Sequence, residues 1–173
     1  MTCIAVKIEK DFIHLCADSE VTMSDWDKSS NIFLWDIVKW YSKIENIWDI
    51  YFGISWTCKE HLRFKQYVKT NNPKGDRLDD IEDYILWFYK ECKEKDSDYK
   101  PCFYVILVYK KKVFSIIDHM IYEVENFDAK GSWMYYAITA MHLGKTAYEA
   151  IEVAKEFAQG VGGDIVEYKI KKK

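Results

Sequence analysis

The 173-residue chain has little glycine and proline, no long apolar run and no excess of basic residues. With 7 glycines and 2 prolines, it has no room for a long flexible linker or a low-complexity tail. No segment approaches the roughly 18 uninterrupted apolar residues of a membrane span. Its formal net charge of −3 differs from the strong basic excess typical of nucleic-acid-binding domains. We therefore expect neither a membrane nor a nucleic acid as a partner.

The five cysteines also lack a recognisable pattern. They form no CxxC pair, and their spacing to the four histidines matches no zinc motif. Charged residues at Lys7, Glu9 and Lys10 come too early for a signal-peptide apolar region. We interpret the chain as a cytoplasmic protein with free thiols that requires no cofactor.

The residues that are present predict one folded domain over 1–173. The chain is 49% hydrophobic and 17% aromatic, which excludes intrinsic disorder and supplies a core of ordinary size. Alternation and apolar runs predict strands over 2–8, 12–17, 37–44, 47–56, 102–109, 113–117, 120–127 and 164–170. Helical spacing predicts helices over 57–69, 78–95 and 131–142, and from 146 onward, while 23–31 is predicted to be a polar loop.

The order of these elements predicts the fold class. Two groups of strands alternate with two pairs of helices, and each group of strands needs both of its faces covered. A four-layer α/β/β/α sandwich, within the α+β class, satisfies this requirement. The pattern Thr146-Ala-Tyr-Glu149 predicts a capping box at the start of the last helix.

Thr2 is the first candidate for chemistry. A small second residue generally permits removal of the initiator methionine, which would leave a threonine at the N-terminus. Such a residue combines a nucleophilic hydroxyl with an α-amine whose ordinary pKa is about 7.7–8.0, so the amine can serve as the base near neutral pH. No histidine is then required.

Several motifs together resemble the proteasome β-subunit and HslV-type family of N-terminal-nucleophile hydrolases. The opening hairpin, from Thr2-Cys-Ile-Ala-Val through Cys-Ala-Asp18-Ser19, is similar to that family's nucleophile strand and its Asp-containing end. Lys43, ahead of a strand, resembles the family's catalytic lysine, with Lys39 as the competing candidate. Gly131-Ser132 resembles the family's Gly-Ser-Gly, although a helix N-cap would explain Ser132 equally well. The resemblance covers nearly the whole chain.

The resemblance implies a threonine-type endopeptidase in a self-compartmentalising homo-oligomeric ring, with peptide or protein substrates and an ATP-dependent unfoldase as partner. It implies that Thr2 is the nucleophile, Asp18 and Lys43 tune its amine, and Ser132 orients the amine. An oxyanion and substrate cleft would involve Ser19, Gly53, Ser55, Trp56 and Gly131. In such relatives, backbone carbonyls at the positions of Gly163, Val166 and Lys169 hold a structural sodium ion.

Two tryptophans depart from the family pattern. Trp56 stands near the expected oxyanion turn, where the family has Gly-Gly, and Trp133 replaces the glycine after Ser132. Both would fill space that glycine leaves open to substrate. They motivate an alternative, namely a catalytically silent proteasome-like subunit that assembles or binds a partner. A non-peptidase amide hydrolase of the same superfamily is a further alternative, whereas Cys3 would become a terminal nucleophile only after loss of Thr2.

Overall fold

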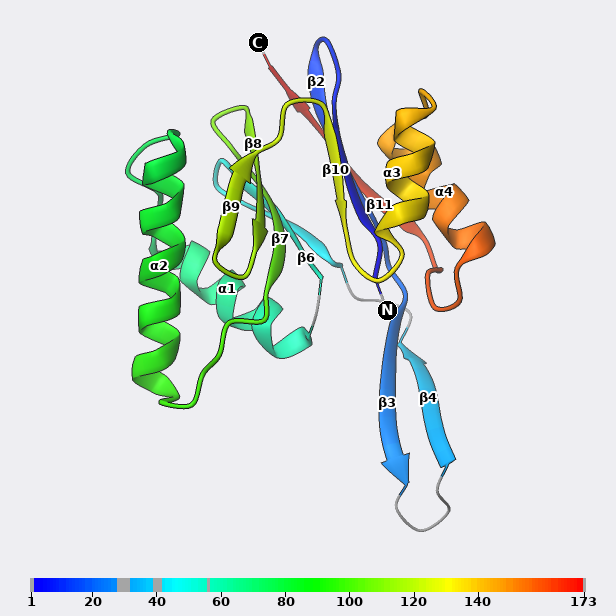
Figure 1. Cartoon of the computed structure of the whole chain (residues 1–173), viewed down its shortest axis with the longest axis horizontal. Helices are drawn as coiled ribbons and strands as arrows, with labels where there is room; N and C mark the ends of the chain where they lie inside the picture. Colours follow the sequence, from blue (N-terminus) through cyan, green and yellow to red (C-terminus); the bar gives the residue numbers. More distant parts are fainter. Residues whose placement is uncertain (1, 28–31, 39–41, 56, 173) are drawn as a thin grey trace.

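The computed structural model describes residues 2–27, 32–38, 42–55 and 57–172, and two β-sheets form its centre (Figure 1). The four-stranded sheet has the order β10-β1-β2-β11, made of Phe127–Lys130, Ile4–Ile8, Phe12–Asp18 and Ile165–Lys171. The five-stranded sheet has the order β5-β6-β7-β8-β9, made of Ile44–Ile47, Ile50–Ser55, Tyr104–Tyr109, Lys112–Ile117 and Met120–Glu123. Neighbouring strands are antiparallel throughout both sheets.

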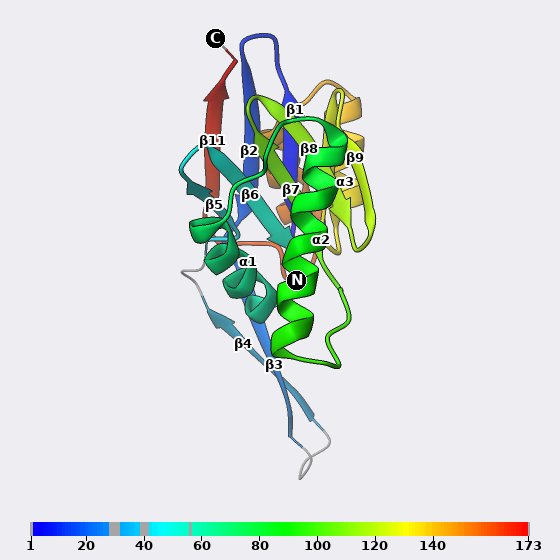
Figure 2. The ribbon, with the colours of Figure 1, turned by 90° about the vertical axis from the view of Figure 1, so that its left-hand side faces the viewer.

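Two helix pairs cover the outer faces of these sheets (Figures 1 and 2). Helices α1 (Cys58–Thr70) and α2 (Leu78–Lys95) lie on the five-stranded sheet, and α3 (Met134–His142) and α4 (Ala147–Phe157) lie on the four-stranded sheet. The predicted capping box is confirmed, because the Thr146 hydroxyl accepts from Glu149 N while the Glu149 carboxylate accepts from Thr146 N. The four-layer α/β/β/α sandwich predicted from the sequence is therefore confirmed.

Three hydrophobic clusters correspond to the three interfaces between the layers. An aromatic-rich cluster around Phe64, Phe88 and Phe103 joins α1 and α2 to their sheet. An alanine-rich cluster joins α3 and α4 to the other sheet, and a cluster of aliphatic residues that includes Ile4 and Ile106 fills the space between the sheets. Successive β1 side chains alternate between the last two clusters, as the pleat of a strand requires.

Two parts of the expected strand pattern are wrong. Residues 23–27, predicted as a loop, lie in β3 (Val21–Asp27), which pairs with β4 (Ile32–Val38) in a two-stranded hairpin. The strand predicted over 37–44 coincides only with the end of β4, and β5 begins at Ile44; residues 28–31 and 39–41 lie outside the described residues. This hairpin projects beyond the layers (Figures 1 and 2), so no layer of the sandwich imposes an apolar alternation on it. The predicted strand over 120–127 divides into β9 and β10, which belong to different sheets.

Within the described part of the chain, none of the helices has the combination of length and apolar character needed to cross a membrane.

Candidate active site

The Asp18 carboxylate, at the end of β2, accepts hydrogen bonds from three separate segments of the chain. Its Oδ2 accepts a hydrogen bond from Lys43 Nζ at 2.7 Å, and its Oδ1 accepts one from the backbone N of Cys3 at 2.8 Å. The backbone N of Gly162 donates to Oδ2 at 3.3 Å. Asp18 is fully buried, so these donors replace the water that a carboxylate needs. Two residues predicted to cooperate, Asp18 and Lys43, are thus brought together.

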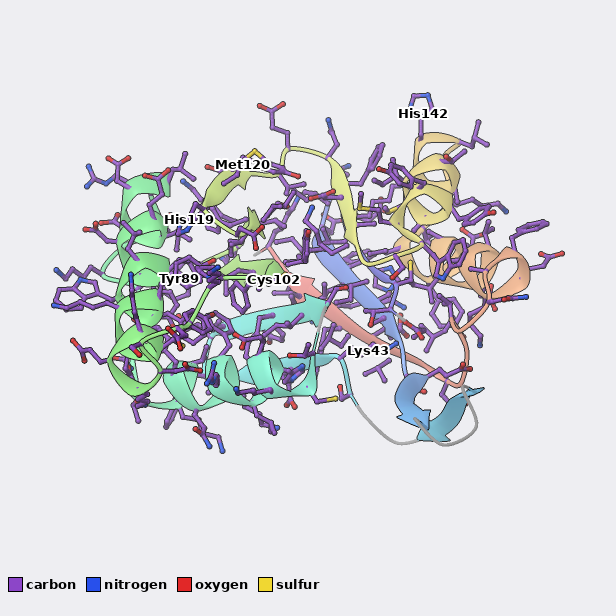
Figure 3. All side chains as sticks on the ribbon, turned by 60° about the horizontal axis from the view of Figure 1, so that its bottom comes forward. Lys43, Tyr89, Cys102, His119, Met120 and His142 are labelled. Atoms are coloured by element: carbon purple, nitrogen blue, oxygen red, sulfur yellow. The ribbon has the colours of Figure 1, made fainter. Side chains whose placement is uncertain are left out.

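Lys43 is a buried cation near the start of the chain. Only 3% of the residue is exposed, and it lies near the middle of the molecule (Figure 3). Burial lowers the pKa of its ammonium below the ordinary value of 10.5, and the charge of Asp18 partly opposes this shift. Asp18 also accepts a hydrogen bond from the backbone N–H of Cys3, the residue after Thr2. Two hydrogen bonds to one carboxylate therefore link the Lys43 ammonium to the backbone beside Thr2. The competing candidate Lys39 lies outside the described residues.

Thr2 itself is held against Gly131, the residue that follows β10. Gly131 has a φ of +114°, and a Cβ added there would overlap the Thr2 carbonyl oxygen. The same Cβ would lie 3.3 Å from Ser55 Oγ, at the end of β6. Thr2 is 8% exposed and Ser55 6% exposed. The nucleophile candidate, Gly131 and Ser55 therefore converge where the two sheets meet.

Replacing Gly131 by alanine is expected to destabilise the protein by about 2–5 kcal/mol, because strain at positive φ adds to overlap with Thr2. Gly144 offers a matched control, since it has a φ of +94° but open space around its Cβ position. Gly144→Ala should cost only the strain of the positive φ, about 1–2 kcal/mol. Chemical denaturation measures both values, and equal losses would contradict the close approach of Gly131 to Thr2.

Ser132 lies next to this point, but its side chain makes no hydrogen bond with the described part of the chain. It is exposed, and the N-cap position of α3 is occupied by Trp133, which makes no side-chain capping bond. The Trp133 indole Nε1 is buried and has no hydrogen-bond partner among the residues that the structure describes. The Trp133 carbonyl accepts from Cys3 Sγ at 3.9 Å. Orientation of the Thr2 amine by Ser132 therefore stays a prediction.

Two residues expected in the cleft have structural contacts instead. Ser19 N donates to the Asp164 carbonyl at 3.0 Å, and the Ser19 hydroxyl accepts from Asp164 N at 2.9 Å. Gly53 lies inside β6, paired on both sides, rather than in a turn. A Cβ on Gly53 would lie 2.8 Å from Ile4 Cγ2, so this glycine permits close packing of the sheets. Trp56 lies outside the described residues, so an oxyanion donor stays a prediction.

Two of the three carbonyls predicted to hold sodium belong to one strand, and the third accepts a hydrogen bond. Val166 and Lys169 are both in β11, which pairs with β2 along its whole length, so three residues separate them by about 10 Å. The Gly163 carbonyl accepts a hydrogen bond from Lys155 Nζ at 2.6 Å and already has a cationic partner. A sodium site at these three positions stays a prediction.

A second buried lysine was not anticipated from the sequence. Lys130, directly before Gly131, is 2% exposed and lies opposite Ile4 in the register of β1 and β10. Its ammonium donates to Asp128 Oδ2 at 2.5 Å and to the Tyr122 hydroxyl at 3.3 Å. The only sequence signal for Lys130 was a single lysine at the end of a short strand. Such lysines are too common to indicate a buried or functional cation.

Other reactive side chains do not compete for this site. His119 and His142 lie well apart from Lys43, towards the α2 and α3 sides of the molecule respectively (Figure 3). Cys3 is adjacent to Thr2, but burial, with a smaller contribution from Asp18, raises the pKa of its thiol to about 12. It is therefore protonated near neutral pH and is a poor nucleophile.

Comparison with known proteins identifies the fold. No family model and no curated protein matches the sequence. The structure of Thiobacillus denitrificans BPH in complex with epoxomicin matches with a TM-score of 0.81 and 16% identity, over 99% of both chains. Another BPH structure matches with a TM-score of 0.74 and 17% identity, over 99% of this chain and 98% of that one. Eukaryotic HslV from Trypanosoma brucei gives a TM-score of 0.71 and 14% identity, over 98% of this chain and 99% of that one. The chain therefore has the N-terminal-nucleophile hydrolase fold of HslV-type proteins, as its sequence resemblance predicted.

Proposed function

We propose that the protein is a proteasome-like threonine peptidase whose nucleophile is Thr2 after removal of Met1. The observation that supports this most strongly is the buried Asp18 carboxylate, which binds both Lys43 Nζ and the N–H of Cys3 beside Thr2. An ion pair with side-chain exposures of 4% and 0% is costly to bury. Groups whose pKa is shifted by burial, as that of Lys43 is, are concentrated at functional sites.

In the proposed reaction, Thr2 Oγ attacks the carbonyl carbon of the peptide while the freed Thr2 amine accepts the hydroxyl proton. The protonated amine then gives that proton to the departing peptide amine as the C–N bond breaks. Water adds to the resulting ester, the amine again accepting a proton, and the acid product leaves with Oγ reprotonated. The Lys43 ammonium lowers the proton affinity of the amine, and Asp18 holds Lys43 in place.

The pH dependence of kcat/KM follows from the ionisation of the Thr2 amine and that of the Lys43 ammonium. kcat/KM is expected to rise with pH as the Thr2 amine loses its proton. The nearby cation lowers the pKa of this amine, so the rise should occur below the ordinary pKa of about 7.7–8.0. kcat/KM should fall again when Lys43 loses its charge, at a pH below 10.5 because burial lowers that pKa. In Lys43→Arg, the residual activity should lose the falling limb, since arginine stays charged. A wild-type profile without a falling limb below 10.5 would contradict this role of Lys43.

We further propose a homo-oligomeric ring that receives peptides or unfolded proteins from an ATP-dependent unfoldase, by analogy with HslV-type proteins. Turnover of a panel of fluorogenic peptides by the chain lacking Met1, together with native mass spectrometry, tests the enzyme and the assembly separately. Turnover by a defined ring is the expected result.

A catalytically silent subunit is the second candidate. It is favoured by the 8% exposure of Thr2 and by Trp133 in place of a glycine beside Ser132. A ring that neither hydrolyses the panel nor reacts with epoxomicin, the compound present in the similar BPH structure, would favour this function over the peptidase.

A further inference from the structure

Three side chains of different ligand type meet on the helix-side face of the four-stranded sheet. His14 and Cys16 are two residues apart on β2, so they point to the same face. Glu167 on β11 is the register partner of Cys16. One ligand atom from each side chain, an imidazole nitrogen, the thiol sulfur and a carboxylate oxygen, all lie within 4.8 Å of one another.

This cluster is partly enclosed but reachable from the edge of the sheet. His14 is 3% exposed and Cys16 is fully buried, whereas the Glu167 side chain is 37% exposed on the outer strand β11. His14 Nε2 and Glu167 Oε2 are 2.6 Å apart, which fixes the imidazole ring towards the carboxylate. An ion could therefore enter beside Glu167 and meet two buried donors that are already in place.

We propose that His14, Cys16 and Glu167 form a Zn²⁺ site that joins β2 to β11. Mixed nitrogen, sulfur and oxygen ligands suit this borderline ion, which in open sites takes three protein ligands and one water in tetrahedral geometry. Hard cations such as Mg²⁺ and Ca²⁺ prefer oxygen ligands and would gain nothing from the thiol. The site is separate from the Thr2 site, although Cys16 precedes Asp18 by two residues, about 7 Å along the strand.

The two neighbouring lysines, Lys169 and Lys7, are compatible with a metal ion bound by these three side chains. Lys169 Nζ lies 3.4 Å from Glu167 Oε2, but its side chain is 56% exposed and can turn into solvent when a metal takes that oxygen. Lys7 faces His14 in the register of β1 and β2, and its ammonium is directed to the Lys145 carbonyl at 2.6 Å.

Titration of the untagged full chain with Co²⁺, as a spectroscopic substitute for Zn²⁺, tests the proposal. We expect a thiolate-to-cobalt absorption band in the near ultraviolet that saturates at one equivalent and is removed by Zn²⁺. The band should be absent in Cys16→Ala, and Glu167→Gln should bind at least about tenfold more weakly. Cys58→Ser changes an exposed cysteine on α1 and should bind like the wild type.

Thermal unfolding provides a second measurement, because a metal that binds only the folded chain raises its Tm. Added Zn²⁺ should raise the Tm of the wild type and Cys58→Ser, and raise that of Glu167→Gln less. Glu167→Gln changes a partly exposed side chain and should fold, so it still tests the proposal if Cys16→Ala fails to fold. The absence of a cobalt–thiolate band in the wild type, its persistence in folded Cys16→Ala, or unchanged affinity in Glu167→Gln would overturn the proposal.

Discussion

Replacing Thr2 by alanine is expected to reduce peptide turnover by at least about 10³-fold, because removal of a catalytic nucleophile leaves only binding and oxyanion stabilisation. Thr2→Ser is the matched control, since serine keeps both the hydroxyl and the terminal amine and should retain turnover. Alanine and serine are both small, so methionine removal should proceed in both variants.

This comparison separates chemistry from folding. Thr2 is 8% exposed. Thr2→Ser removes one methyl group and Thr2→Ala removes that methyl and the hydroxyl, so neither adds bulk and far-ultraviolet circular dichroism should show the wild-type fold. Reaction with epoxomicin should be lost in Thr2→Ala and kept in Thr2→Ser. Equal turnover by wild type and Thr2→Ala would show that another residue carries the reaction.

Breaking the Asp18–Lys43 pair is expected to affect both stability and activity. Lys43→Met leaves a fully buried carboxylate without its cation, and Asp18→Asn leaves a buried ammonium without its anion. Each change should lower the free energy of unfolding by about 3–5 kcal/mol. Lys95→Ala removes one member of an exposed pair with Glu91 and should leave stability nearly unchanged.

The double variant Asp18→Asn/Lys43→Met distinguishes a structural from a functional role of this pair. Removing both charges relieves the burial of an uncompensated ion, so the double variant should be more stable than either single one. If Lys43 tunes the Thr2 amine, peptide turnover should nevertheless stay low. Recovery of turnover together with stability would assign the pair to folding alone.

Periodicity and capping residues predicted most of the fold. The helix over 78–95 was predicted with the observed bounds, because an acidic first turn, a lysine-rich last turn and one apolar face mark it clearly. The hairpin of β3 and β4 was not predicted; it forms a two-stranded sheet of its own that projects beyond the layers of the sandwich. Residues 23–31 are mostly polar, which is typical of a loop, and the apolar run of β4 begins before the strand that was predicted over 37–44.

The candidate site was predictable only in part. Family resemblance indicated Asp18 and Lys43, which the structure places 2.7 Å apart. The strand predicted over 47–56 already contained Gly53, but the close packing of this glycine against Ile4 was not predictable from the sequence.

The three proposed zinc ligands match no known sequence motif. His14 and Cys16 share a face only because side chains alternate along a strand. Glu167 is 153 residues from His14 along the chain, so only the pairing of β2 and β11 brings them together.

The central claim is that Thr2 becomes the N-terminal residue and acts as the nucleophile. It is tested most directly by intact and peptide-level mass spectrometry of the protein after incubation with epoxomicin. The account predicts a chain that lacks Met1 and carries one epoxomicin on Thr2. A chain that retains Met1, or one that lacks it and stays unmodified while hydrolysing peptides, would contradict the account.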